Sequence, residues 1–217
     1  MQRGRDLAPL AHGTAPVDSA SIMGSVRPPE PWLALASTSP RRSALLVEAG
    51  IPFVLAEPGP EPESSGTPRE LAANRARSKA RFASRPLGCV APLLGVDTVV
   101  DLDGRELPKP TDRAEAEAML RSLAGHRHFV HTAHCLFDPC ADRIVENVIS
   151  AIVECGAVVE SELLAYLDTG DWRGKAGAYG IQDGSQRFLR LVEGPFDAVM
   201  GMHVASVRQL LREVAGA

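Results

Sequence analysis

The sequence contains few aromatic residues and no long run of apolar residues. Aromatic side chains make up 5% of the 217 residues, and the formal net charge is −4. Nucleic-acid-binding modules usually present a basic face interleaved with aromatic side chains, which a mildly acidic chain poor in aromatics does not offer. No apolar run approaches the roughly 18 to 20 residues of a membrane-spanning helix. We therefore expect no nucleic-acid partner and no membrane partner, so any phosphate binding requires a local cluster of cations.

Cysteine and lysine are also scarce. The four cysteines, Cys89, Cys135, Cys140 and Cys155, are too few for a disulfide scaffold in a chain of this length. The amino end lacks the apolar core of a secretory signal peptide. We therefore expect free thiols and a cytoplasmic protein. Only three of the 23 basic residues are lysines, Lys79, Lys109 and Lys175, which suggests positions where a compact ammonium suits better than a planar guanidinium.

The composition is otherwise that of an ordinary globular protein, with 45% hydrophobic and 23% charged residues. Residues 1–30 are the exception, because they are rich in Ala, Gly, Ser and Pro and show no helical or strand period. This pattern predicts a disordered leader. Met23 is an alternative start of the chain, and a translated tail is the other interpretation. Residues 31–217 are predicted to form one domain with a sizeable core.

The ordered part begins with a short apolar run that predicts a strand, followed by the sequence Ser-Thr-Ser-Pro-Arg-Arg. Ser39 can cap a helix whose first residue is Pro40. Arg41 and Arg42 then lie beside the free N–H groups and the positive dipole end of that helix, an arrangement that suits a phosphate. A surface helix with solvated arginines is the alternative interpretation.

A second helix is predicted to begin at Thr67, where Thr-Pro-Arg-Glu forms a capping box with Pro at the first helical position. Lys79 lies on or beside the apolar stripe of that helix, which is formed by spaced alanines. A lysine there either extends its ammonium to solvent along the apolar surface or points into a cleft.

Asp97 lies inside an apolar run that predicts a buried strand ending in an Asp-Gly hairpin turn. A buried carboxylate requires a cation, a metal ion or hydrogen-bond donors; a strand-end aspartate that caps a loop is the alternative. Beyond the hairpin, Pro110 holds Lys109 in an extended conformation rather than in a helix.

The segment that begins at Gly174 is rich in glycine, with further glycines at positions 177 and 180. Glycines allow a backbone to approach a ligand closely, which indicates a binding loop, although the spacing is neither a dinucleotide fingerprint nor a P-loop. A strand over residues 186–192 and a terminal helix over residues 198–214 are predicted to follow.

Four of these segments, in this order, resemble the Maf family of nucleoside triphosphate pyrophosphatases over about residues 32–214. The motifs are Ser39-Pro-Arg-Arg, Gly95-Val-Asp-Thr-Val-Val, Leu107-Pro-Lys-Pro and Lys175-Ala-Gly-Ala-Tyr-Gly-Ile-Gln. The alternation of strands and helices predicts an α/β fold, with a mixed central sheet flanked by helices and two lobes around an active-site cleft. The resemblance implies the same fold (ITPase/Maf-like). It also implies hydrolysis of dTTP or UTP to the monophosphate and pyrophosphate, a house-cleaning activity for which modified pyrimidine nucleotides are further candidate substrates.

The resemblance also implies roles for individual residues. The cations expected to hold the triphosphate are Arg41, Arg42, Lys79 and Lys109. The residues tied to the choice of base are Arg41, Thr98 and Gln182. Asp97 is the expected catalytic proton acceptor, and Asp97 and Glu61 are the expected ligands of Mg²⁺ or Mn²⁺, since hard divalent cations prefer carboxylate oxygens.

Other features of the sequence leave alternatives open. The segment around Pro195 and the pair Met202-His203 depart from the family pattern, which puts base preference and a dimer surface in doubt. A homodimer is implied by the resemblance alone. The alternative function is a non-catalytic nucleotide-binding regulator of cell division and septum formation, which needs the phosphate-binding cations but not both carboxylates.

Overall fold

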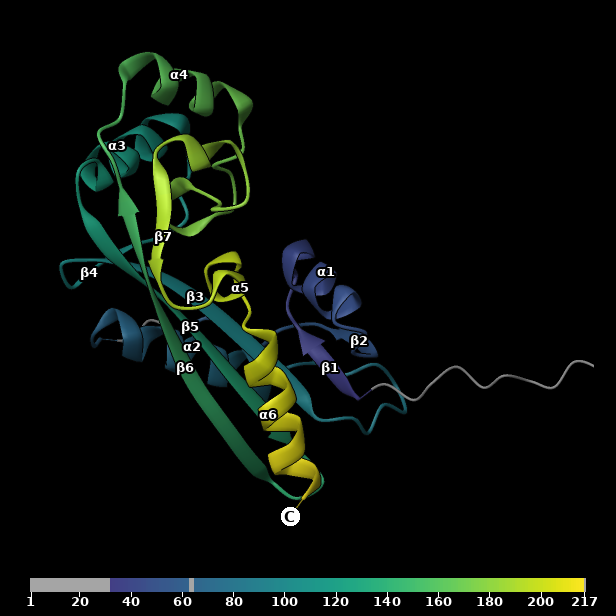
Figure 1. Cartoon of the computed structure of the whole chain (residues 1–217). Coiled ribbons are helices and arrows are strands. Elements are labelled where there is room, and N and C mark those ends of the chain that lie inside the picture. Colours follow the sequence, from purple (N-terminus) through teal and green to yellow (C-terminus); the bar gives the residue numbers. More distant parts are fainter. Residues whose placement is uncertain (1–31, 63–64, 217) are drawn as a thin grey trace, which may run out of the picture.

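The computed structural model describes residues 32–62 and 65–216, arranged around one long, twisted sheet (Figure 1). The predicted leader, residues 1–30, lies outside the described residues. The strands are β1 (Leu33–Ala36), β2 (Phe53–Ala56), β3 (Leu93–Leu102), β4 (Arg105–Leu107), β5 (Arg127–Asp138), β6 (Arg143–Cys155) and β7 (Leu189–Glu193). The α-helices are α1 (Pro40–Glu48), α2 (Pro68–Arg81), α3 (Arg113–Leu123), α4 (Glu160–Thr169), α5 (Phe196–Met200) and α6 (Val204–Ala215), and two 3₁₀ helices are η1 (Ala176–Ala178) and η2 (Gly184–Arg187).

The sheet is mixed and has seven strands in the order β2-β1-β3-β5-β6-β7, with β4 paired to β3. Strands β2, β1 and β3 run parallel, whereas β3, β5, β6 and β7 are joined by antiparallel pairing. The predicted α/β fold with a mixed central sheet is confirmed.

One edge of β3 is only partly paired. Strand β1 pairs with residues 93–95 of β3, and β4 pairs with residues 100–102. Within the described chain no strand covers residues 96–99 on that edge. This gap leaves the middle of β3 open to the space between β1 and β4, and it contains both Asp97 and Thr98.

Helices cover the two faces of the sheet differently. The α2 face is lined by small side chains, among them Ala72, Ala76 and Ala80 of α2 and Ala34 and Ala133 of the sheet. Helices α1 and α6 cover the opposite face with larger residues, among them Leu46, Val207 and Leu210. Gly95 of β3 allows the close approach of α2, because an added Cβ would lie 2.6 Å from the backbone nitrogen of Ala80.

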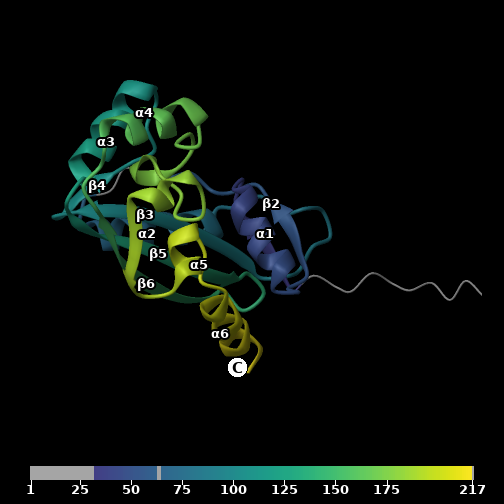
Figure 2. The same cartoon turned by 45° about the horizontal axis from the view of Figure 1, so that its top comes forward.

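A second cluster of elements forms around α3 and α4 at one end of the sheet. Both views show this group, together with β7, separated from the group of β1, β2 and α1 (Figures 1 and 2). Its own core includes Trp172 and Tyr179. The molecule therefore has the two lobes that the sequence predicts. None of the helices in the described segments is both long enough and apolar enough to span a membrane.

The local start signals are confirmed, whereas the predicted carboxyl-terminal elements are partly wrong. Helix α1 begins at Pro40, and α2 begins after Thr67 with both bonds of the capping box present. The strand predicted over residues 186–192 begins at Leu189, because η2 occupies the preceding residues. The helix predicted over residues 198–214 is two helices, α5 and α6, because Gly201 between them has φ +118°, a conformation that ends a helix.

Candidate functional site

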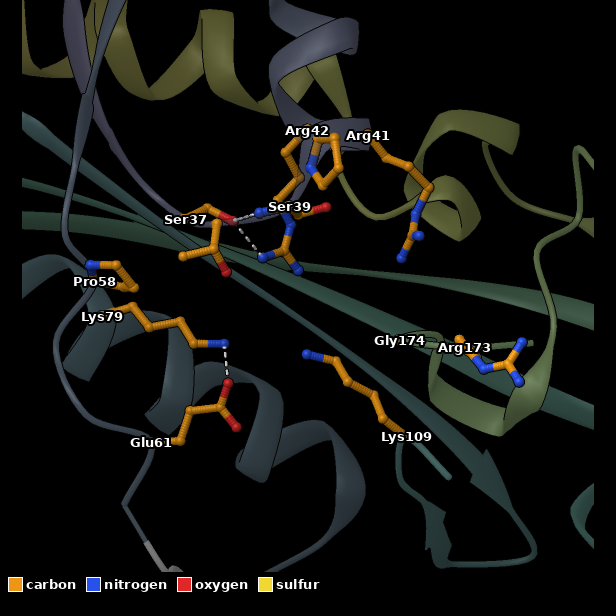
Figure 3. Close-up of a pocket in the computed structure, with 12 residues that line it drawn as sticks. Ser37, Ser39, Arg41, Arg42, Pro58, Glu61, Lys79, Lys109, Arg173 and Gly174 are labelled. Carbon is orange, nitrogen blue, oxygen red and sulfur yellow. Dashed lines mark hydrogen bonds and ion pairs between the residues drawn. The ribbon is translucent and has the colours of Figure 1, made fainter. Parts of the chain in front are cut away.

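The main cavity of the described structure lies between the two lobes and has a volume of about 390 Å³ (Figure 3). Its lining includes residues from the α1 side and, opposite them, Lys109 and Arg173. The charged side chains that line it are Arg41, Arg42, Glu61, Lys79, Lys109 and Arg173. The cavity is therefore strongly cationic although the chain carries a net charge of −4.

The turn between β1 and α1 forms one wall of this cavity. Strand β1 ends at Ala36, and Ser37, the residue that follows, accepts a hydrogen bond from the backbone N–H of Ser39 at 3.2 Å. Ser39 occupies the predicted N-cap position of α1, but its side chain makes no capping hydrogen bond. The first residues of α1, Pro40, Arg41 and Arg42, line the cavity. The first N–H groups of a helix have no partner within the helix and suit an anion.

Arg41 and Arg42 behave differently. The guanidinium of Arg41 points into the cavity (Figure 3), and its burial lowers its pKa while the charge of Asp183 raises it. Arg42 instead donates from Nη1 to Ser37 Oγ at 3.0 Å, from Nε to the carbonyl oxygen of Gly201 at 2.9 Å, and from Nη2 to Thr98 Oγ1 at 3.4 Å. Arg42 therefore holds the turn through three hydrogen bonds. It also lines the cavity, and its expected role as a phosphate ligand stays a prediction.

Lys79 joins the two carboxylates of the site. Its ammonium contacts Oδ1 of Asp97 at 2.5 Å and Oε1 of Glu61 at 2.7 Å, and the side chains of Lys79 and Asp97 are only 8% and 9% exposed. The buried Asp97 therefore has the cation partner that its position in an apolar strand requires. Of the two sequence interpretations for Lys79, the one in which it points into a cleft is confirmed.

Glu61 is held ionised by its neighbours. Burial by itself raises the pKa of Glu61. The hydrogen bond and charge of Lys79, together with the charges of Lys109 and Arg75, lower it by more than burial raises it, so the net shift is downward. Lys109 is exposed and its ammonium points toward the middle of the cavity (Figure 3). Lys109 lies between Pro108 and Pro110 and outside any helix, as predicted; the extended conformation itself stays a prediction.

A second cavity of about 280 Å³ adjoins the first one. Glu61 and Lys109 line both cavities, and Asp97 and Thr98 line the second cavity at the gap in the edge of β3. An ion pair between Arg75 of α2 and Glu106 of β4 forms part of its wall, with nitrogen–oxygen distances of 2.5 and 3.0 Å. Sequence reasoning missed this pair and Arg173, because none of these residues belongs to a local pattern. It also assigned no role to Ser37, although Ser37 begins the Ser-Thr-Ser-Pro-Arg-Arg run.

The carboxylates have free capacity for a cation. Asp97 Oδ2 is buried and has no hydrogen-bond partner, and Glu61 approaches the same ammonium as Asp97. Residues 32–62 and 65–216 contain no cluster of three or more His, Cys, Asp or Glu side chains suited to a metal ion. Two carboxylates are enough for a magnesium ion that takes its other ligands from water and substrate phosphates. They are too few for a site in which the protein supplies every ligand.

The glycine-rich segment forms a loop beside the first cavity, which Gly174 helps to line. Lys175 and Asp183 close this loop with an ion pair, and Gly177 has φ +66°, which favours glycine. Gln182 is half-buried and is not among the residues that line either cavity. The structure thus brings together Arg41, Lys79, Asp97, Thr98, Lys109 and Glu61 but not Gln182, whose role in base choice stays a prediction.

Fold and site together define a two-lobed, mixed α/β protein with a cationic cleft and a lysine-bridged pair of carboxylates. The model of one protein family, the Maf-like proteins, matches residues 32–214. The chain belongs to this family.

Curated relatives cover most of the chain. A dTTP/UTP pyrophosphatase of Thermus thermophilus is 42% identical over 190 residues, 87% of this chain and 96% of the relative. The dTTP/UTP pyrophosphatase of Gluconobacter oxydans is 37% identical over 196 residues, 85% and 88% of the two chains. That of Bordetella avium is 42% identical over 192 residues, 84% and 94% of the two chains.

Proposed function

We propose that the protein is a nucleoside triphosphate pyrophosphatase that hydrolyses dTTP and UTP to the monophosphate and pyrophosphate. The observation that carries the proposal is the buried Lys79 between Asp97 and Glu61, at the junction of the two cavities. Its relatives named dTTP/UTP pyrophosphatase support the substrate class.

The first cavity holds the triphosphate. Arg41 and Lys109 direct their charges into it from opposite sides (Figure 3), and the N-terminus of α1 adds backbone N–H donors. Donors and positive charges placed around the phosphates stabilise the negative charge that develops on the leaving pyrophosphate.

A divalent cation, Mg²⁺ or Mn²⁺, is held by Asp97 and Glu61. The unpartnered Asp97 Oδ2 and the lowered pKa of Glu61 support this assignment, since both provide anionic oxygen. When bound, such an ion neutralises phosphate charge and lowers the pKa of a coordinated water.

Asp97 orients the attacking water and accepts its proton. The water oxygen forms a bond to the α-phosphorus, the bond from that phosphorus to the α–β bridging oxygen breaks, and pyrophosphate leaves. Lys79 fixes the orientation of the Asp97 carboxylate, because its ammonium donates a hydrogen bond of 2.5 Å to Oδ1. Asp97 Oδ2 is buried and has no hydrogen-bond partner in the described residues, so the contact with the cation and the contact with the water would both use this oxygen.

The test is pyrophosphate release from a panel of canonical and modified nucleoside triphosphates with Mg²⁺ or Mn²⁺. We expect turnover of dTTP and UTP, and a loss of at least about 100-fold in kcat for Asp97→Asn. The matched control is Asp101→Asn on the same strand, whose carboxylate bonds His131 and the N–H of Gly104 instead of Lys79. An Asp97→Asn enzyme with near-parental kcat would overturn the assigned role.

The alternative function, a non-catalytic regulator of cell division, predicts nucleotide binding without turnover by the parent protein. The presence of both carboxylates favours catalysis. Our proposal of a pyrophosphatase also includes a homodimer, no nucleic-acid partner and a cytoplasmic location. All four cysteines are unpaired, which agrees with a reducing compartment.

A further inference from the structure

Lys175 is the one lysine of the chain to which the proposed mechanism gives no role. It lies in the glycine-rich loop, residues 174–183, and lines neither cavity. Its ammonium forms an ion pair with Oδ2 of Asp183, and the two side chains are 13% and 15% exposed. Oδ1 of Asp183 also accepts a hydrogen bond from the backbone N–H of Ser185 at 3.1 Å. The ion pair therefore ties the beginning of the loop to its end.

The backbone between these two charges has an unusual conformation. Gly177 and Ala178 are consecutive residues with positive φ, +66° and +62°. This conformation is unfavourable for a residue with a side chain, and such residues are found most often at functional sites. Ala178 is 0% exposed, so packing holds it in place. An added Cβ at Gly177 would lie 3.1 Å from both γ-methyl carbons of Val100, so the loop lies tightly against β3 at this point.

This turn contacts the segment that carries Lys109. The backbone N–H of Gly177 donates a hydrogen bond of 3.1 Å to the carbonyl oxygen of Pro108. Residues 108–110 lie outside every helix and strand, and two of them are prolines, which have no N–H to donate. Within the described chain, the bond from Gly177 is the one backbone hydrogen bond of this segment. Ala176 of the loop also lines the second cavity beside Pro108 and Lys109.

We propose that Lys175 and Asp183 are positioning residues that hold Lys109 against the triphosphate. Their ion pair closes the loop, and the closed loop keeps the N–H of Gly177 on the carbonyl of Pro108, the residue before Lys109. The ammonium of Lys109 points toward the middle of the first cavity (Figure 3). A cation that is already in place binds a phosphate more tightly than one that must be ordered on binding. The placement of the triphosphate rests on the proposed function.

The experiment measures binding, so that it does not depend on turnover. Isothermal titration calorimetry of the full chain uses Mg²⁺ and the α,β-methylene analogue of UTP. Lys175→Met removes the charge and keeps an unbranched side chain, and we expect it to lower the affinity about tenfold, because Lys109 is no longer held in place. In a Lys109→Met background the same substitution should lower the affinity less than about twofold, because the cation through which it acts is absent.

The matched control is Arg113→Met, which breaks an exposed ion pair with Asp168 at α3. It should change the affinity less than about twofold in both backgrounds. The control separates the loss of any ion pair near the loop from the loss of the one that closes it.

Two results would overturn the inference. One is parental affinity in folded Lys175→Met, and the other is an equal loss in the parent and Lys109→Met backgrounds, since Lys175 would then act on another group. If Lys175→Met does not fold, Asp183→Asn takes its place in the same cycle, because it removes the charge of the pair and can still accept from Ser185. A parent that shows the coupling but releases no pyrophosphate would leave this inference standing and overturn the proposed hydrolysis.

Discussion

Lys79 shows how the size of one cation sets the geometry of the site. Its ammonium reaches two carboxylates from a helix whose face packs closely on the sheet, and the side chain is 8% exposed. Such a position has room for a compact ammonium, but the planar guanidinium of arginine is wider and directs its N–H groups differently. In a chain that otherwise uses arginine almost everywhere, a lysine here has a steric reason.

We therefore predict that Lys79→Arg, although it conserves charge, lowers kcat/KM for UTP about 100-fold or more, because the two carboxylates lose their common partner. Steady-state kinetics checks this. The control is Arg81→Lys on the same helix, an exposed residue paired with Asp142, which should change kcat/KM less than about twofold. Near-parental activity of Lys79→Arg would show that the bridge is not needed.

His134 is a buried histidine that must stay neutral. Its Nε2 accepts a hydrogen bond from the backbone N–H of His203 at 2.9 Å, and Nδ1 lies 3.1 Å from the amide oxygen of Asn147. Burial lowers the pKa of His134 to about 3. Protonation would therefore break the bond to His203 and bury a charge at the link between α5 and α6.

This shift predicts loss of stability in acid. The unfolded chain takes up a proton near pH 6.5 and the folded chain only near pH 3, so the free energy of unfolding falls as the pH drops through this window, by about 1.4 kcal/mol per pH unit for this histidine. Urea denaturation at several pH values should show a shallower dependence for His134→Gln. His126→Gln, at an exposed position, is the control and should keep the parental slope.

At the scale of elements, the approach of α2 to β3 sets the distance between Lys79 and Asp97. Gly95 makes that approach possible, since its Cβ position is already filled by the backbone of α2. We predict that Gly95→Ala lowers the free energy of unfolding by about 2 kcal/mol. It should also lower kcat, because α2 moves away from the strand that carries Asp97.

The matched control is Gly156→Ala. An added Cβ there would meet its nearest neighbour, the carbonyl oxygen of Phe188, at an ordinary 3.7 Å. Thermal melting compares the stability of the two variants, and steady-state kinetics compares their kcat. If Gly95→Ala melts and turns over like Gly156→Ala, the close approach does not control the site.

Local signals were enough to predict the elements that carry the site. The capping box at Thr67 placed α2, and Pro40 placed the start of α1, because capping depends only on neighbouring residues. The sequence did not predict β2, a four-residue strand, or the break at Gly201. Both features depend on partners elsewhere in the chain. Strand β2 forms by pairing with β1, and the carbonyl of Gly201 accepts a hydrogen bond from Arg42.

At the scale of the whole molecule, the sequence predicted which residues are chemically suited to the site better than it predicted their contacts. An aspartate in an apolar strand requires a partner, and Lys79 is that partner. The hydrogen bonds of Arg42, the position of Gln182 outside both cavities and the pair Arg75–Glu106 depend on how the lobes meet across the sheet. No local spacing encodes such contacts.

The long strands have a mechanical consequence. Strands β5 and β6, of 12 and 13 residues, are paired over residues 127–138 of β5 and 143–154 of β6, and they run along the length of the sheet (Figure 1). A continuous ladder of hydrogen bonds resists bending. We therefore expect the two lobes to keep their relative orientation instead of closing about a hinge. Capture of a nucleotide then falls to long side chains such as Arg41 and Lys109. Small-angle X-ray scattering should accordingly show the same radius of gyration with and without a bound, non-hydrolysable nucleotide, whereas a measurable contraction would reveal a hinge.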